Sequence, residues 1–310
     1  MEKMNNRVYG VVGIKSVLAN WNADFTGRPK TTSDGNIFGS DKAFKYPIKK
    51  MWESEDKDEK VLYVKSYKNE KGNLQARTLA ERFEQLFGKD VKSIKDKKEI
   101  LKYLFSAIDV QNFGATFAEG SNNISITGAV QIGQGLNKFE DSAVEVIDIL
   151  SPFVDATKKD TAQNTSIGKK IVSNEAHYFY PFSVNPQNYD IYTKEIEDLE
   201  GYTKESYEKF KRGCLIAATA YNTNSKAGCE NEFALFVECK ENSKLYLANL
   251  DQYIKFEKQE EKDIIDVTEL EEILNKEEIK SEIEKVEIYY NPYTTNLVGA
   301  KEGDIIKSLF

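Results

Sequence analysis

Short strands rich in Val, Ile and aromatic residues alternate with amphipathic helices along this chain, and this order limits the folds open to it. The residue pattern predicts strands at Arg7–Ser16, Val61–Lys68, Val110–Ala118, Ile124–Ile132, Ala176–Val184, Glu232–Cys239 and Leu245–Leu250. Helical spacing predicts helices at Ser40–Trp52, with Ser40 as N-cap, and at Leu79–Phe87, Lys97–Ala107, Lys204–Asn222 and Val267–Val286. The order indicates an α+β fold with helices backing an antiparallel sheet, most simply a ferredoxin-like, RRM-type core enlarged by insertions.

The charge of the chain is unevenly distributed. The net charge is −8, and residues 251–310 alone carry 8 basic and 16 acidic residues, so residues 1–250 are neutral. Residues 1–50 hold 9 basic residues against 4 acidic ones. Because nucleic-acid affinity depends on a local basic surface more than on total charge, the acidic balance does not exclude a nucleic-acid partner. The acidic C-terminal segment is either a solvated helix face or a contact for a basic neighbour.

The sequence lacks the common catalytic and metal-binding motifs. Three cysteines without a CxxC pair predict reduced thiols packed as small apolar groups, which fits a cytoplasmic protein. The single histidine, His177, lies in an aromatic strand, where we expect a hydrogen-bonded structural role. There is no P-loop and no HExxH pattern. No stretch reaches the roughly 18 apolar residues of a membrane span, and the apolar N-terminal run is expected to be a strand and not a signal peptide.

The most informative segment is the loop after the first strand. Asn20 to Gly39 is dense in Asn, Asp, Gly, Thr and Pro, and it opens with NWNADFTGRPK. RNA is bound by Arg and Lys at phosphates, by amides and hydroxyls at sugars, and by aromatic rings beneath bases. Because this loop contains all three kinds of residue, it favours RNA binding over a purely structural role.

Further patterns lie in a fixed order along the chain. They are WNADFTGRPKTTSDGNIFGSDKAFKY (Trp21–Tyr46), DVQNFGATFA (Asp109–Ala118), ITGAVQIGQGLNKF (Ile126–Phe139), TSIGKKIV (Thr165–Val172) and HYFYPFSVNP (His177–Pro186). Together they resemble the Cas-seven backbone family of type I CRISPR surveillance complexes (Cascade), in its I-B subtype. Gln111 stands where the family usually has Arg. The resemblance runs from about Arg7 to Cys239.

The resemblance implies a single hand-like domain over residues 1–310. It would comprise an RRM-like palm, a finger or helical insertion at about 53–108, a thumb insertion at about 140–172, and an acidic helical flank with a closing strand at 255–310. Copies of such a subunit polymerise along the crRNA spacer and leave its bases free to pair with target DNA. The implied partners are crRNA, target DNA through the guide, further copies of the chain, and the large, small and crRNA-end-binding Cascade subunits. The implied role is non-enzymatic, with no cofactor, no metal and no membrane.

The resemblance also implies a set of RNA-binding residues. They are Trp21, Asn22, Arg28 and Lys30 in the loop; Lys42 and Lys45 on the next helix; Gln111 and Phe113 on the central strand; Gln131, Gln134 and Lys138 along the glycine-rich strand; and Ser166, Ile167, Lys169 and Lys170 in the thumb. Ile167 would act as an apolar wedge at an RNA kink. The alternative interpretation of Lys42 and Lys45 is that they are simply solvated lysines. The alternative for the glycines of the glycine-rich strand is a bulge that only bends the strand.

Two other functions remain open on the sequence alone. A metal-dependent endoribonuclease, as in type III backbone subunits, would act through Asp24 or His177. We expect instead that the Asp24 carboxylate binds local backbone in a turn, and we expect no catalytic residue. A structural protein–protein module would bind no RNA.

Overall fold

Three long strands form the centre of the molecule. The computed structural model describes residues 2–120, 122–150 and 166–310 of the chain. Strand β1 (Val8–Ala19) lies between β10 (Ser166–Val184) and β11 (Cys229–Cys239) and pairs antiparallel with both. Nearly every residue of β1 is buried, which explains why this strand is apolar without strict alternation.

These strands belong to a nine-stranded mixed sheet. Its order is β16-β14-β11-β1-β10-β8-β2, and β7 and β9 also pair with β10. The pair β14 and β16 is parallel, whereas the other described pairs of this sheet are antiparallel. The outer strands are β2 (Phe38–Gly39), β7 (Val130–Ile132), β8 (Gly135–Asn137), β9 (Val144–Leu150), β14 (Ile283–Tyr290) and β16 (Ile305–Ser308).

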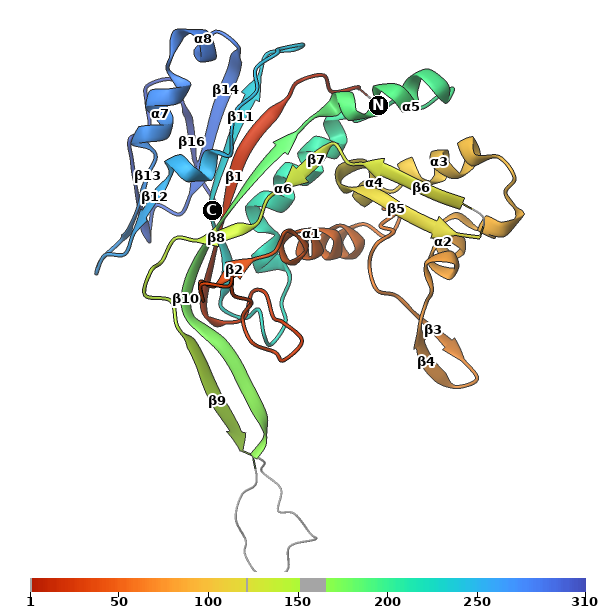
Figure 1. Cartoon of the computed structure of the whole chain (residues 1–310), viewed down its shortest axis with the longest axis horizontal. Helices are drawn as coiled ribbons and strands as arrows, with labels where there is room; N and C mark the ends of the chain where they lie inside the picture. Colours follow the sequence, from red (N-terminus) through yellow and green to blue (C-terminus); the bar gives the residue numbers. More distant parts are fainter. Residues whose placement is uncertain (1, 121, 151–165) are drawn as a thin grey trace, which may run out of the picture.

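Helices α1 (Asp41–Glu55) and α6 (Lys204–Ala220) cover one face of the sheet (Figure 1). Ser40 caps α1 by accepting a hydrogen bond from the backbone N–H of Ala43, as the sequence predicted. The two helices approach closely at Gly213, where a Cβ atom would lie 2.8 Å from the Ile48 side chain. Apolar residues of both helices and of the central strands form the larger core, which includes the buried thiol of Cys214.

The C-terminal segment covers the opposite face (blue in Figure 1). It contains a second sheet of β12 (Lys255–Glu257), β13 (Asp263–Asp266) and β15 (Thr295–Val298), and helices α7 (Thr268–Leu274) and α8 (Glu277–Lys280). Ile265 and Leu270 of this segment pack with Val11 and Leu235 of the large sheet in a second core. The predicted α+β fold is therefore confirmed.

The residues between α1 and β7 form a lobe beside the sheet (orange to yellow in Figure 1). It contains helices α2 (Leu79–Phe87), α3 (Lys97–Phe105) and α4 (Ile108–Phe113), and the hairpins β3 (Tyr67–Glu70) with β4 (Asn73–Ala76) and β5 (Gly114–Glu119) with β6 (Asn122–Thr127). Its centre is aromatic, because Phe83 contacts Phe87, Tyr103 and Phe117. The predicted helices at 79–87 and 97–107 are confirmed, the second of them ending at Phe105.

A long hairpin of β9 and the first half of β10 extends away from the rest of the molecule (Figure 1). Val144 pairs with Ser173 at its base, and β9 is exposed along almost its whole length. The hairpin falls within the range predicted for the thumb insertion. Residues 151–165, which also belong to this predicted range, lie outside the described residues.

The remaining elements are short. They are helix α5 (Asp190–Glu195) and the 3₁₀ turns η1 (Val91–Ser93), η2 (Pro186–Tyr189) and η3 (Leu250–Tyr253). Within the described ranges, no helix has the length and apolar character needed to cross a membrane.

Two predicted strands in the lobe differ from the structure. Val61, Leu62 and Val64 are buried, but residues 61–66 are irregular, because the Asp109 carboxylate, and not a neighbouring strand, binds the backbone N–H groups of Leu62 and Tyr63. The predicted strand Val110–Ala118 begins as helix α4 and becomes β5 only at Gly114, whose φ of +75° makes the turn. Gln111 and Phe113 therefore lie on a helix and not on the predicted strand.

Three other predicted elements also differ. The predicted strand at 124–132 is interrupted at Gly128–Ala129, between β6 and β7. Residues 245–249 form no strand, although Leu245 and Leu247 pack against the second core. The predicted helix at 267–286 is α7, α8 and the start of β14, because Asn275 ends α7 by donating its amide to the Glu271 carbonyl. Apolar spacing alone did not separate three short elements that share one core.

Candidate nucleic-acid interface

A groove of about 590 Å³ lies between α1 and the β5–β6 hairpin. Lys42, Lys45 and Lys49 line its α1 side, because spacings of three and four residues place them on one helix face. Tyr63 and Phe113 line it from the lobe. The groove thus combines ammonium groups with aromatic rings, the two kinds of group that bind phosphates and bases.

Phe113 is held in the groove by its neighbours. Its ring stacks on the indole of Trp52, with 5.8 Å between the ring centroids. The ammonium nitrogens of Lys45 and Lys49 lie 5.5 and 5.6 Å from the centroid of the Phe113 ring. Such cation–π contacts fix both the ring and the lysines. Phe113 remains only half-buried, so part of its surface stays available to a ligand.

Lys49 is anchored at the bottom of the groove by Asp109. Its ammonium nitrogen lies 3.4 Å from a carboxylate oxygen of Asp109, a residue with no exposed surface. Burial lowers the pKa of Lys49, and the Asp109 carboxylate opposes that shift. Burial and the same carboxylate raise the pKa of Tyr63 to about 12, so the Tyr63 hydroxyl stays neutral and donates to the Thr116 carbonyl.

The rest of the lysine face is partly compensated. Lys45 pairs with Asp41 at 2.9 Å. Burial opposes ionisation of Asp41, but the Lys45 ammonium and, to a smaller degree, the Gln134 amide hold the pKa of Asp41 below its usual value. Lys42 is exposed and forms no ion pair with the part of the chain that is described.

Two of the predicted loop residues are buried instead of facing a ligand. Trp21 has 1% exposure, and its indole N–H donates to the Tyr180 hydroxyl at 2.6 Å. Asn22 donates to the Phe38 carbonyl and accepts from the Ser40 hydroxyl, so it joins the loop to the start of α1. Both side chains hold the loop in place, and in this conformation neither can reach an RNA strand.

Lys226 fixes the start of the same loop from another direction. Its ammonium donates to the carbonyls of Asn20 and Trp21 and lies 5.0 Å from the Trp21 ring centroid. Burial lowers the pKa of Lys226 to about 8. Asn20 also donates to the Ile171 carbonyl, which connects the loop to the base of the β9–β10 hairpin.

The exposed part of the loop carries Arg28 and, half-buried, Lys30. Asp24 shapes this part, because one of its carboxylate oxygens accepts hydrogen bonds from the backbone N–H groups of Thr26 and Arg28 and from the Thr26 hydroxyl. The Thr26 hydroxyl, followed by these backbone groups, lowers the pKa of Asp24. The expected turn role of Asp24 is confirmed.

Three other predicted contacts are occupied within the chain. The Gln111 amide donates to the Phe105 carbonyl and accepts from the Ser206 hydroxyl. Lys138 donates to the Asp251 carbonyl at 2.8 Å, and its burial lowers its pKa. Gln131 is exposed but donates to the Gly128 carbonyl. These side chains do not join the lysine groove.

Two of the predicted thumb lysines lie on the protruding hairpin. Lys169 is exposed and Lys170 is half-buried, and adjacent strand residues point to opposite faces of β10. Ser166 and Ile167 lie on the same strand, next to the part of the chain outside the described residues. The opposing strand β9 exposes the apolar residues Val146, Ile147, Ile149 and Leu150.

Comparisons of the sequence and the fold with known proteins identify the family of this chain. The profile of the family described as CRISPR-associated protein Cas7 matches residues 6–278. The chain belongs to the Cas7 family. A chain of a solved structure described as "CRISPR RNA-guided surveillance complex, pre-nicking" superposes with a TM-score of 0.57 at 14% sequence identity, over 97% of this chain and 96% of that chain. This likeness shows a shared fold.

A second solved chain, from a "CRISPR RNA-guided surveillance complex", has a TM-score of 0.44 and 14% identity and covers 94% of this Cas7-family chain and 95% of its own length. No curated protein matches the sequence significantly.

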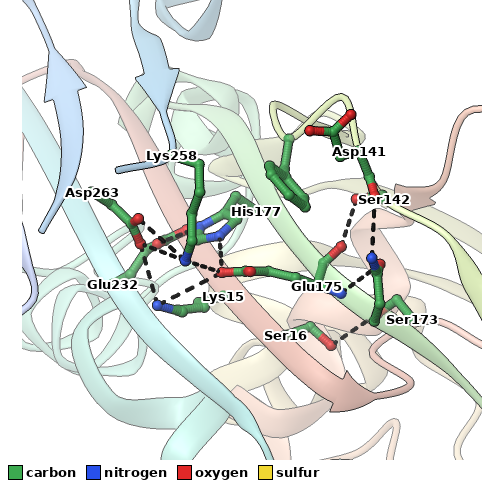
Figure 2. Close-up of polar contacts among 12 residues, drawn as sticks. Lys15, Ser16, Asp141, Ser142, Ser173, Glu175, His177, Glu232, Lys258 and Asp263 are labelled. Atoms are coloured by element: carbon green, nitrogen blue, oxygen red, sulfur yellow. Dashed lines mark hydrogen bonds and ion pairs between the residues drawn. The ribbon is translucent and has the colours of Figure 1, made fainter. Parts of the chain in front are cut away.

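A second polar cluster of this Cas7-family chain surrounds His177 (Figure 2). One ring nitrogen of His177 lies 2.8 Å from Glu232 and the other 3.0 Å from Glu175, while Phe256 stacks on the ring at 3.9 Å. Burial alone would lower the pKa of His177, but the two carboxylates raise it. The expected hydrogen-bonded role of His177 is confirmed.

Glu175, His177 and Asp263 are the one group of metal-ligand type found among the described residues. Two lysines already neutralise its carboxylates. Lys258 lies 2.7 Å from Glu175 and 3.2 Å from Asp263, and Lys15 lies 3.4 Å from Asp263 (Figure 2). This network fastens β12 and β13 to the large sheet and is better suited to that task than to holding a cation.

The sequence prediction missed Lys49, Tyr46 and Tyr63, which also line the groove. Lys49 could have been found, because it continues the spacing of Lys42 and Lys45 along the helix. Tyr63 could not, because it lies in a segment that the pattern assigned to a strand and reaches the groove only through its backbone bond to Asp109.

Proposed function

We propose that this chain is a non-enzymatic crRNA-binding backbone subunit of a type I CRISPR surveillance complex, of the I-B kind. It polymerises along the guide spacer and presents the guide bases for pairing with target DNA. The observation that carries the proposal is the lysine and aromatic groove between α1 and β5 in a chain of the Cas7 family.

The chemistry of the groove supports binding by the RNA backbone. Lys42, which forms no ion pair within the described residues, offers its ammonium group to a phosphate, while Lys45 and Lys49 hold Phe113 with part of its ring accessible. Contacts to phosphate and sugar position a strand without reading its sequence. A guide held in this way keeps its base edges free, and base pairing then supplies the specificity.

The domain arrangement supports the hand-like interpretation. Strands β11, β1, β10 and β8 are antiparallel neighbours with α1 and α6 on one face, an order that matches an RRM-like palm. In this proposal the finger at about 53–108 is part of the lobe, the β9–β10 hairpin within about 140–172 is the thumb, and residues 255–310 are the acidic flank. The flank covers the sheet face that isolated RRM domains use for RNA, which directs the RNA to the groove.

The partners follow from this role. They are crRNA, target DNA through the guide, further copies of the chain, and the large, small and crRNA-end-binding Cascade subunits. Eight of the predicted contacts are exposed or partly exposed and are compatible with this role: Arg28, Lys30, Lys42, Lys45, Phe113, Gln134, Lys169 and Lys170.

Binding of a fluorescent 30-nucleotide single-stranded RNA, measured by anisotropy over a salt series, tests the proposal. We expect tight binding whose logarithmic salt slope falls when Lys42 and Lys45 are both changed to Gln, because each lost phosphate contact removes about 0.7 from the slope. Changing Lys169 and Lys170 together to Gln should weaken binding in the same way without unfolding the protein.

The matched control is Lys240→Gln with Lys244→Gln, an exposed pair outside the groove. Equal affinity and slope for all variants would contradict the proposal.

A further inference from the structure

Phe25 is the most exposed large apolar side chain among the described residues, with 110% relative exposure. It lies at the tip of the loop between β1 and α1, on a turn whose neighbours Thr26, Gly27 and Arg28 are also exposed. An aromatic ring held in water forfeits the free energy of burial. The other exposed residues of the turn, Thr26, Gly27 and Arg28, carry no large apolar side chain, so the turn itself does not form the broad apolar patch that marks a protein interface.

The turn that carries Phe25 is rigid. The backbone N–H of Asp24 donates to the Arg28 carbonyl at 2.7 Å, and the N–H of Gly27 donates to the Asp24 carbonyl at 3.2 Å. The Asp24 carboxylate adds its bonds to Thr26 and Arg28, and Gly27 takes the left-handed φ of +81° that the turn requires. A ring presented on such a turn loses little conformational freedom when it binds, which favours affinity.

The loop also places this ring beside the proposed RNA path. Asn20 ties the loop to β10 at the base of the β9–β10 hairpin, through the Ile171 carbonyl. Asn22 ties it to Ser40 at the start of α1, whose next turns carry Lys42 and Lys45. Arg28 leaves the same turn and has no ion pair within the described ranges.

We propose that Phe25 is a stacking platform for one base of a bound ribonucleotide strand, with Arg28 contacting an adjacent phosphate. This inference rests on the proposed function and adds to it a defined base-binding residue. Every base has a π-face, so a platform of this kind accepts any sequence, in keeping with a protein that holds many different guides. A single exposed aromatic on a turn that also carries Thr26 and Arg28 suits a nucleotide better than the broad apolar patches that mark protein interfaces.

Anisotropy with the same single-stranded RNA tests the inference through three substitutions. Phe25→Ala should weaken binding about 5- to 150-fold, the range for loss of one stacked base. RNA binding by Phe25→Leu should be as weak as that by Phe25→Ala, because leucine keeps the apolar volume but has no π-face. Phe25→Trp should bind like the wild type, and its added emission should be quenched by RNA. Tyr293→Ala removes a similarly exposed aromatic from the C-terminal segment and should change nothing.

Three results separate the possible failures. Unchanged affinity of Phe25→Ala, with tight binding by the wild type, overturns the inference and leaves the proposed function standing. Wild-type affinity of Phe25→Leu for the RNA also overturns it, because an apolar side chain without a π-face would then suffice. A wild-type chain that does not bind the RNA overturns the proposed function and this inference together.

Discussion

Asp109 is the residue whose removal should damage the groove most. Its carboxylate is fully buried, accepts from the backbone N–H groups of Leu62 and Tyr63 at 2.8 Å each, and lies 3.4 Å from the ammonium of Lys49. It therefore holds an irregular segment of the lobe and a groove lysine at once. No other hydrogen bond to these two N–H groups is present in the described part of the chain.

The cost of Asp109→Ala can be worked out from these contacts. The change leaves Lys49 buried without its counterion, and breaking one side of a buried pair costs about 3–5 kcal/mol. The two N–H groups left without acceptors increase this loss of stability further, but by less than the sum of the separate costs. We take about 4 kcal/mol. At about 2.1 cal/mol/K of unfolding entropy per residue, the 310-residue chain should then lose about 6 °C in Tm. Asp109→Asn keeps one oxygen acceptor and should lose about half as much.

Differential scanning calorimetry of the purified chain measures this shift. Asp34→Ala is the matched control, because Asp34 is exposed and a surface change of this kind stays within about 0.5 kcal/mol. A Tm for Asp109→Ala within about 1 °C of the wild type would refute the reasoning. It would show that the carboxylate is not what holds the segment at 61–63.

Three further predictions concern single residues. Trp21→Phe removes the hydrogen bond to Tyr180 and should lower the stability by about 1–3 kcal/mol. The variant should still bind RNA with wild-type affinity when measured by anisotropy. A selective loss of affinity would show that Trp21 is an RNA contact after all. Burial, then Asp304, raises the pKa of Glu271 from 4.5 to about 7, so its contribution to stability is complete below pH 4.5 and is lost as the pH rises through 7. Glu271→Gln should therefore gain up to about 3 kcal/mol at pH 8 and nothing at pH 4, and equal Tm shifts at both pH values would contradict this. With Mg²⁺, bound RNA should stay intact for the wild type and for Asp24→Ala on denaturing gels, whereas cleavage by the wild type alone would favour an endoribonuclease.

The sequence was sufficient for features that are local. The long strands, the Ser40 cap and the helix at 204–220 follow from residue type and spacing, which act within a few residues. The same local logic placed Lys42 and Lys45 on one helix face. It also assigned Asp24 to a turn, since an Asp side chain commonly bonds to backbone two residues ahead.

Features that depend on distant contacts could not be predicted in this way. Trp21 looks like a ligand-binding aromatic in a polar loop, and only its bond to Tyr180, 159 residues away, shows that it is buried. In the sequence Gln111 looks available for RNA, but in the structure its amide is hydrogen-bonded to Ser206 and Phe105. The segment at 61–66 alternates like a strand, but its hydrogen-bond partner is a side chain at position 109. In each case a tertiary contact overrides a correct local signal.

Cross-linking of bound RNA tests the central claim most directly. Single-stranded RNA containing 4-thiouridine would be irradiated with the full chain, and the attached peptides identified by mass spectrometry. The account predicts attachment at the groove and its borders, in peptides spanning residues 24–30, 42–49, 113–116 and 166–172. Attachment confined to the acidic segment at 255–310, or to the outer surface of α6, would contradict it.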